Sequence, residues 1–253
     1  MTDGVAKLRE KLKSREKVFA TTVVNIAWSG LAQILKPSIL DCLILDLEHG
    51  TITGESAEEL LRMCNVLDLP TVARAADKEY ISVSRVFDMG VDGVLVPRVE
   101  TVAEATQIVE YARFPPRGKK GCGGFSLLRN VAGVEAFNDT KTLLIQIESR
   151  KGIENLPAMI DIGEFDGIVI GPTDLSIDLG VPLQFDSSRF REAVTEILNV
   201  CQDRRISCGM FFGDANEAEQ WRKVGMNVLW VGTELVFLQM GYQNTCEAIA
   251  ALQ

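Results

Sequence analysis

Eight strand-length apolar segments recur along this chain, and most are followed by a segment with the apolar spacing of a helix. The segments are continuously apolar rather than alternating, which is typical of parallel strands buried on both faces. A repeated strand–helix unit of this kind predicts a closed (β/α)8 TIM barrel. The expected strands are 18–25, 42–48, 70–74, 93–97, 142–148, 167–172, 207–212 and 227–232.

The barrel is expected to be a single domain over 1–253, with an extra N-terminal helix near 5–13 packed outside the repeat. Helices are expected at 56–67, 80–89, 101–113, 188–203, 216–224 and 235–251. An open doubly wound sheet is the alternative, but no glycine fingerprint follows the first strand. The segment 114–139 is rich in proline and glycine, and we interpret it as a long loop on the catalytic face.

Composition excludes several classes of function. The net charge is −9 and the pI is about 4.8, so a nucleic-acid partner is not expected. No apolar run is long enough to span a membrane, and no basic, apolar signal precedes the first strand. The six cysteines form no C-x-x-C pair and are interpreted as reduced thiols. We therefore expect a cytoplasmic protein.

Polar side chains stand at the ends of several expected strands, although the strands themselves are apolar. Asp46, Glu48 and His49 end the second strand and Arg74 ends the third. Gln146, Glu148 and Ser149 end the fifth, and Asp174 follows the sixth. His49 is the only histidine, so any imidazole-based proton transfer must use it. Because the barrel brings its strand ends to one rim, the sequence predicts a catalytic site there.

Glu148 and Asp174 are candidate oxygen ligands for a hard divalent cation, Mg²⁺ first, with Mn²⁺ or Co²⁺ as alternatives. The competing interpretation is that Asp174 caps the following turn and that Glu148 pairs with Arg150 or Lys151. A zinc site is disfavoured, because there is one histidine and no cysteine pair. No expected strand ends in a lysine, so Schiff-base chemistry is disfavoured as well.

Seven motifs occur in the order and spacing of a known family. The chain resembles the HpcH/HpaI group, the class II metal-dependent 2-keto-3-deoxy acid aldolases typified by 4-hydroxy-2-oxoheptanedioate aldolase. The two most specific motifs are Ile-Gln-Ile-Glu at 145–148 and Gly-Pro-Thr-Asp-Leu-Ser at 171–176. The others lie at 45–50, 72–74, 88–91, 96–101 and 113–118.

The resemblance implies a role for each matched residue. Glu148 and Asp174 would bind the metal, and Arg74 would hydrogen-bond the keto oxygen of pyruvate and steady the enolate. His49 would be the base, acting through bound water. Asp46, together with Asp88 of the partner subunit, would orient it.

The resemblance also implies substrate contacts and an assembly. The carboxylate of the 2-oxo acid substrate would be placed by Gln146 and by the backbone at Gly171, Pro172 and Thr173. Family members form hexamers, trimers of dimers with an exchanged last helix, so a homo-oligomer is expected.

The favoured function is a metal-dependent carbon–carbon lyase, an aldehyde-lyase that cleaves a 4-hydroxy-2-oxo acid to pyruvate and an aldehyde through a metal-stabilised enolate. The first alternative keeps this chemistry on another substrate, as an oxaloacetate decarboxylase, a biosynthetic enolate-trapping enzyme or an acyl-CoA lyase. The second is a non-catalytic barrel acting as a binding protein. The segment 119–130 departs from the family pattern, which leaves the aldehyde unidentified.

Overall fold

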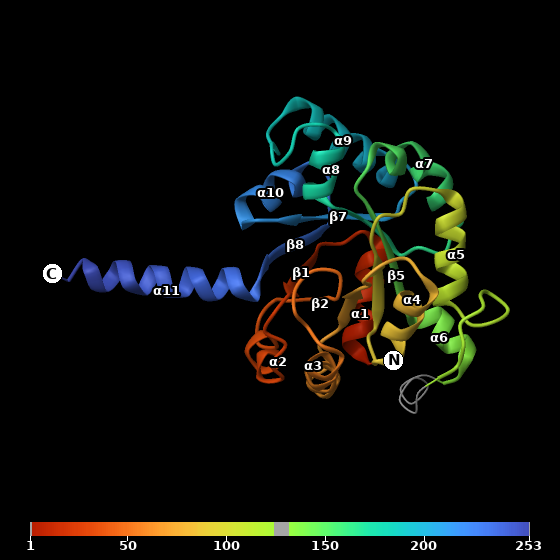
Figure 1. Cartoon of the computed structure of the whole chain (residues 1–253), viewed down its shortest axis with the longest axis horizontal. Helices are drawn as coiled ribbons and strands as arrows, with labels where there is room; N and C mark the ends of the chain where they lie inside the picture. Colours follow the sequence, from red (N-terminus) through yellow and green to blue (C-terminus); the bar gives the residue numbers. More distant parts are fainter. Residues whose placement is uncertain (1, 124–131, 253) are drawn as a thin grey trace.

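A computed structural model of the chain describes residues 2–123 and 132–252 and shows a closed barrel of eight parallel strands (Figure 1). Every strand pairs with the next one in sequence, and the last pairs with the first. All eight expected strands are therefore confirmed. They are β1 (Val18–Val23), β2 (Cys42–Asp46), β3 (Thr71–Arg74), β4 (Gly93–Val96), β5 (Thr142–Ile147), β6 (Gly167–Ile170), β7 (Ser207–Phe212) and β8 (Val228–Thr233).

Helices surround the barrel, and each expected helix is present. The expected ones are α1 (Asp3–Ser14), α3 (Gly54–Val66), α4 (Tyr80–Asp88), α5 (Val102–Ala112), α9 (Ser188–Asp203), α10 (Ala215–Lys223) and α11 (Glu234–Ala250). Sequence periodicity missed α2 (Gly30–Leu35), α6 (Val134–Thr140), α7 (Arg150–Ile160) and α8 (Pro172–Asp178). Three of these span only two turns, and α7 contains Pro157, which obscures a helical pattern.

The N-terminal helix has a different place from the one expected. Leu8 and Leu12 of α1 are buried in one apolar cluster with the inward-facing strand residues Val18, Ile44 and Val72. The helix therefore closes the amino end of the barrel instead of packing outside the repeat. This position removes from water apolar side chains that an open barrel end would expose.

Strand geometry decides which side chains reach the barrel mouth. Successive residues of a strand point to opposite sides, so inward-facing residues are two apart. On three strands this inward series begins with apolar residues and ends with polar ones at the carboxyl end. The series are Cys42, Ile44 and Asp46 on β2, Val72 and Arg74 on β3, and Leu144 and Gln146 on β5 followed by Glu148 just after it.

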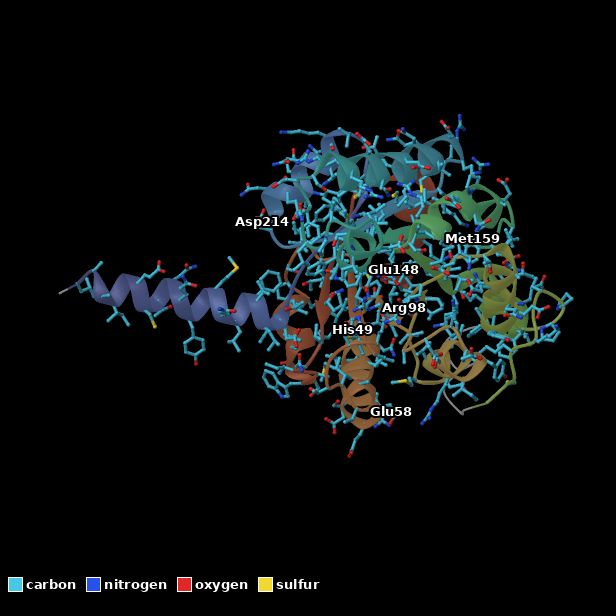
Figure 2. The ribbon with its side chains drawn as sticks, turned by 45° about the horizontal axis from the view of Figure 1, so that its top comes forward. His49, Glu58, Arg98, Glu148, Met159 and Asp214 are labelled. Atoms are coloured by element: carbon cyan, nitrogen blue, oxygen red, sulfur yellow. The ribbon has the colours of Figure 1, made fainter. Side chains whose placement is uncertain are left out.

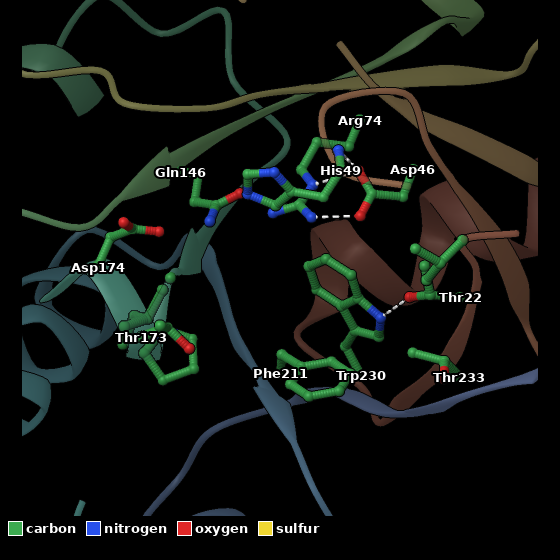
Figure 3. Close-up of a pocket in the computed structure, with 14 residues that line it drawn as sticks. Thr22, Asp46, His49, Arg74, Gln146, Thr173, Asp174, Phe211, Trp230 and Thr233 are labelled. Atoms are coloured by element: carbon green, nitrogen blue, oxygen red, sulfur yellow. Dashed lines mark hydrogen bonds and ion pairs between the residues drawn. The ribbon is translucent and has the colours of Figure 1, made fainter. Parts of the chain in front are cut away.

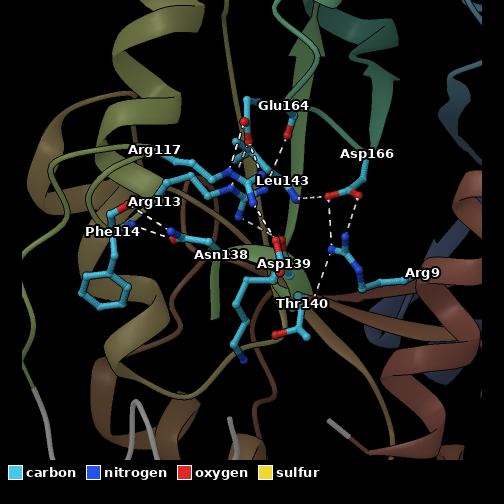
Figure 4. A network of polar contacts seen from close by, with 11 residues as sticks. Arg9, Arg113, Phe114, Arg117, Asn138, Asp139, Thr140, Leu143, Glu164 and Asp166 are labelled. Atoms are coloured by element: carbon cyan, nitrogen blue, oxygen red, sulfur yellow. Dashed lines mark hydrogen bonds and ion pairs between the residues drawn. The ribbon is translucent and has the colours of Figure 1, made fainter. Parts of the chain in front are cut away.

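The expected loop at 114–139 is corrected in two respects. Helix α5 lies between β4 and this segment, so the segment begins at the amino end of the strands and not on the catalytic face. Its last residues form α6, while 124–131 lie outside the described residues. Here Arg113 is buried and donates to the carbonyl of Lys141, and Arg117 pairs with Glu164 and Asp139 (Figure 4). These contacts hold the segment against the turn before β6.

The last helix stands apart from the barrel. Figure 1 shows α11 projecting away from the rest of the chain, and none of its residues is buried. Within residues 2–123 and 132–252, no helix combines the length and the apolar character needed to cross a membrane.

Candidate catalytic and metal site

A cavity of about 230 Å³ opens at the carboxyl end of the strands (Figure 3). Residues from β1, β2, β3, β5, β6, β7 and β8 meet there, as expected of the catalytic end of such a barrel. Eight of the ten predicted site residues line it. They are Asp46, His49, Arg74, Gln146, Gly171, Pro172, Thr173 and Asp174.

Arg74 is held in place by carboxylates on both sides. Its Nε donates to Asp46 Oδ1 over 3.0 Å, and a second guanidinium nitrogen bonds Asp46 Oδ2. A third nitrogen lies 3.3 Å from Glu48 Oε2. The guanidinium also lies over the ring of Trp230, 5.6 Å from its centroid. These contacts fix the position of the positively charged guanidinium group in the wall of the cavity.

His49 is positioned mainly through its backbone. Asp46 Oδ1 accepts hydrogen bonds from the backbone N–H groups of Glu48 and His49, both over 3.1 Å. The imidazole side chain is 53% exposed, and its Nε2 lies 3.8 Å from Glu48 Oε2. Asp46 therefore fixes the turn that carries His49, while the ring remains accessible to a substrate.

Glu148 is a buried carboxyl group near two others. One oxygen accepts from the backbone N–H of Arg98 over 2.8 Å, and the other accepts from Gln146 Nε2 over 2.7 Å. Burial, and after it the negative charges of Asp174 and Glu48, raise the pKa of Glu148 from 4.5 to about 7. The site therefore disfavours an ionised Glu148 unless a cation is added.

Two features of the surroundings of Glu148 fit a bound cation. A Cβ at position 171 would lie 2.1 Å from Glu148 Oε2 and 2.4 Å from Gln146 Nε2, so only glycine leaves room for these groups. The side-chain amide oxygen of Gln146, Oε1, is buried and has no hydrogen-bond partner within the described residues. A buried oxygen of this kind needs a donor or a cation.

Asp174 supplies a second oxygen group from the first turn of α8. It is exposed toward the cavity, and no hydrogen bond to its carboxylate forms within residues 2–123 and 132–252. No group of three or more His, Cys, Asp or Glu side chains in this part of the chain is arranged to hold a metal. The donors thus fit a hard cation that keeps several waters, such as Mg²⁺, and do not fit a closed protein cage.

Sequence reasoning placed Glu48 at the end of the second strand without assigning it a role, and it left Arg98 out of the site. The side chain of Glu48 is 6% exposed, and one of its oxygens lies 3.1 Å from a guanidinium nitrogen of Arg98. Figure 2 shows Arg98 near His49 and Glu148. Arg98 has a φ of +56°, a left-handed conformation that is rare outside glycine. The spacing of two between Asp46 and Glu48 puts both side chains on the same side of the strand. No feature of the sequence indicated that Arg98 would contact this site.

Asp88 lies elsewhere within the subunit. It ends α4 at the amino end of the barrel and pairs with Lys120 Nζ over 2.9 Å. The side chain of Lys120 is fully buried and also bonds the hydroxyl and carbonyl oxygens of Ser84. The contact of Asp88 with His49 of another subunit stays a prediction.

Comparison with known proteins identifies relatives along most of the chain. The profile of the HpcH/HpaI aldolase/citrate lyase family matches residues 24–239. The 2-keto-3-deoxy-L-rhamnonate aldolase of Klebsiella pneumoniae is 30% identical over 81% of this chain and 79% of its own. The 4-hydroxy-2-oxo-heptane-1,7-dioate aldolase of Escherichia coli is 26% identical over 88% of both chains. The crystal structure of an HpcH/HpaI aldolase from Desulfitobacterium hafniense has the same fold, with a TM-score of 0.89, 23% identity and 96% coverage of both chains.

Proposed function

Because this chain belongs to the HpcH/HpaI aldolase/citrate lyase family, we propose that it is a divalent-metal-dependent aldehyde-lyase that cleaves a 4-hydroxy-2-oxo acid to pyruvate and an aldehyde. Relatives named as aldolases support the reaction class. The observation that carries the proposal is the buried Glu148 beside Asp174, with the unpartnered oxygen of Gln146 next to it.

Glu148 and Asp174 would hold the cation, Mg²⁺ or alternatively Mn²⁺ or Co²⁺. When bound, such a cation supplies a Lewis acid that lowers the energy of negative charge on a substrate oxygen. Arg74 contributes the same kind of stabilisation from the protein, because its fixed guanidinium faces the cavity. The keto oxygen at C2 would lie against Arg74.

The cleavage step needs a base. His49 accepts the proton of the C4 hydroxyl group, directly or through one water, and the C3–C4 bond breaks as the C4 carbonyl forms. The bonding electrons move to C3 and onto the C2 oxygen beside Arg74. A proton returned to C3 gives the methyl group of pyruvate. Asp46 assists by holding both the backbone of His49 and the guanidinium of Arg74.

The substrate carboxylate would be placed by the start of α8. The backbone N–H groups of Thr173 and Asp174 lie in the first helical turn and have no partner within the helix. Gln146 lies beside them in the lining of the cavity. This arrangement orients C2 and its oxygen toward Arg74.

Exchange of the methyl protons of pyruvate in D₂O tests the proposal without knowledge of the aldehyde. NMR should show exchange with added Mg²⁺, Mn²⁺ or Co²⁺, and chelation should abolish it. Exchange that persists after chelation would exclude the metal-dependent reaction. Absence of exchange with every metal would exclude a pyruvate site. Release of CO₂ from oxaloacetate with no cleavage of any hydroxy-oxo acid would instead assign a decarboxylase.

We also propose that the chain is a homo-oligomer in which α11 packs on another copy, in the hexameric arrangement of a trimer of dimers. An isolated helix with many exposed apolar residues is unstable in water. The exposed large side chains of α11 are Leu235, Val236, Phe237, Leu238, Met240, Tyr242 and Ile249.

Light scattering after size-exclusion chromatography tests this assembly. Leu238→Glu combined with Met240→Glu should reduce the mass, because both side chains are exposed and apolar here. Asn244→Glu changes charge on the same helix at an exposed polar position and should have a smaller effect. A wild-type chain that is monomeric at micromolar concentration would refute the assembly.

A cytoplasmic location is part of the proposal. All six cysteines are free, four of them buried and two exposed, which suits a reducing compartment. The net charge of −9 remains unfavourable for a nucleic-acid partner. Fractionation of expressing cells would test the location.

A further inference from the structure

The cavity has a second half, formed by β1, β7 and β8, that the cleavage chemistry does not use. Phe211 and Trp230 pack edge to face there, with ring centroids 5.4 Å apart and planes at 84°. Thr22 and Thr233 lie beside them (Figure 3). We define these four residues as the aromatic half of the cavity.

The indole N–H of the aromatic half, and both of its hydroxyl oxygens as acceptors, form hydrogen bonds inside the protein. The indole N–H of Trp230 donates to the hydroxyl oxygen of Thr22. The hydroxyl oxygen of Thr233 accepts from the backbone N–H of Val236 and caps α11. Trp230 is 4% exposed, and Phe211 is partly exposed to the cavity. A ligand that enters this half meets mainly apolar surface.

The aromatic half also lacks a free cation among the described residues. The cationic side chains that line the cavity are Arg74 and, when protonated, His49. Arg74 is bound by Asp46 and Glu48. A carboxylate at the far end of an aldehyde would therefore lose its hydration and gain no partner, which is unfavourable. A hydroxylated aldehyde would also lose hydrogen bonds to water.

We propose that the aldehyde half of the substrate is uncharged and apolar, with an aliphatic or aromatic chain that packs on Phe211. This inference rests on the proposed function, because it assigns the second product of the same site. Pyruvate occupies the end near Gln146 and Asp174. The aldehyde carbon bonded to C3 then lies between His49 and the aromatic half.

Aldol addition of pyruvate to a panel of aldehydes tests the inference. Assays would use the full oligomeric chain with saturating metal and pyruvate. The kcat/KM values for butanal and benzaldehyde should exceed those for glyceraldehyde and succinic semialdehyde by about tenfold or more, the range that one or two apolar contacts give. Glyceraldehyde or succinic semialdehyde as the best acceptor would overturn the inference.

Two substitutions at Phe211 sharpen the test. Phe211→Ala should lower kcat/KM for benzaldehyde about tenfold more than it lowers kcat/KM for glyceraldehyde. Phe211→Arg should raise kcat/KM for succinic semialdehyde, because it adds a cation to the wall. Ile177→Arg adds the same charge at an exposed position outside the cavity lining, and it should not raise kcat/KM for succinic semialdehyde. The inference would be contradicted if both arginine variants changed kcat/KM for succinic semialdehyde equally. It would also be contradicted if Phe211→Arg did not change the preference among the aldehydes.

The two proposals fail in different ways. If the wild-type protein exchanges pyruvate protons but prefers charged acceptors, only the assignment of the aldehyde is wrong. If it exchanges no protons with any metal, the proposed function fails and the inference falls with it. Exchange together with a preference for butanal or benzaldehyde supports both.

Discussion

Glu148→Gln should stabilise the metal-free protein at neutral and alkaline pH while removing metal-dependent activity. The folded-state pKa of Glu148 is raised from 4.5 to about 7 by burial and by Asp174 and Glu48. The folded chain therefore holds this proton more tightly than the unfolded chain does. The stabilisation is fully present below pH 4.5 and is lost as the pH rises through 7.

The magnitude follows from the size of the shift. A pKa that rises from 4.5 to about 7 corresponds to about 3 kcal/mol, at about 1.4 kcal/mol per unit. Glutamine carries no charge, so it avoids this cost. Its oxygen can accept from the N–H of Arg98, and a rotated Gln146 amide can present its unpartnered oxygen to the new NH₂ group.

Urea denaturation in the presence of a chelator, followed by tryptophan fluorescence at fixed protomer concentration, measures the effect. The difference in unfolding free energy between Glu148→Gln and wild type should grow by about 2 to 3 kcal/mol from pH 5 to pH 8. Glu154→Gln, at an exposed position on α7, is the matched control and should show no such growth. A pH-independent difference for Glu148→Gln would refute the assigned electrostatic cost.

Three further changes test the rest of the site. Asp174→Asn should abolish chelator-sensitive proton exchange without changing the far-ultraviolet circular dichroism spectrum, and retained exchange would remove Asp174 from the ligand set. His49→Ala should keep metal affinity by titration calorimetry but lose about 10²-fold to 10⁴-fold in kcat for cleavage, and a wild-type rate would exclude His49 as the base. Gly171→Ala should weaken metal binding, because the added methyl group would lie 2.1 Å from Glu148 Oε2; unchanged affinity would show that the carboxylate is free to move.

Local sequence patterns were sufficient for the barrel and for most of the site. The continuous apolar runs gave all eight strands, because parallel strands buried on both faces require them. The position of polar residues at strand ends predicted that one cavity would hold Asp46, His49, Arg74, Gln146 and Asp174. The structure places all five there. This inference works because a closed parallel barrel brings all carboxyl strand ends to one rim.

The misplaced segments show where local patterns fail. The expected helix at 101–113, which is α5, already places 114–139 at the amino end of the barrel, so the expected catalytic-face loop was an error of topology. The position of α1 beneath the barrel depends on contacts of Leu8 and Leu12 with strands distant in sequence. The position of α1 has no signature in the composition of its own segment.

The sequence by itself determined the order of elements, the inward-facing series and the residue types available at the rim, because each follows from spacing along one strand or helix. Only the tertiary structure decided which charges meet. The contacts of Glu48 with Arg74 and Arg98, of Lys120 with Asp88, and of Trp230 with Thr22 join residues that are separate in the chain. Pair distances, burial and the resulting pKa of Glu148 depend on how eight strands close around a common axis.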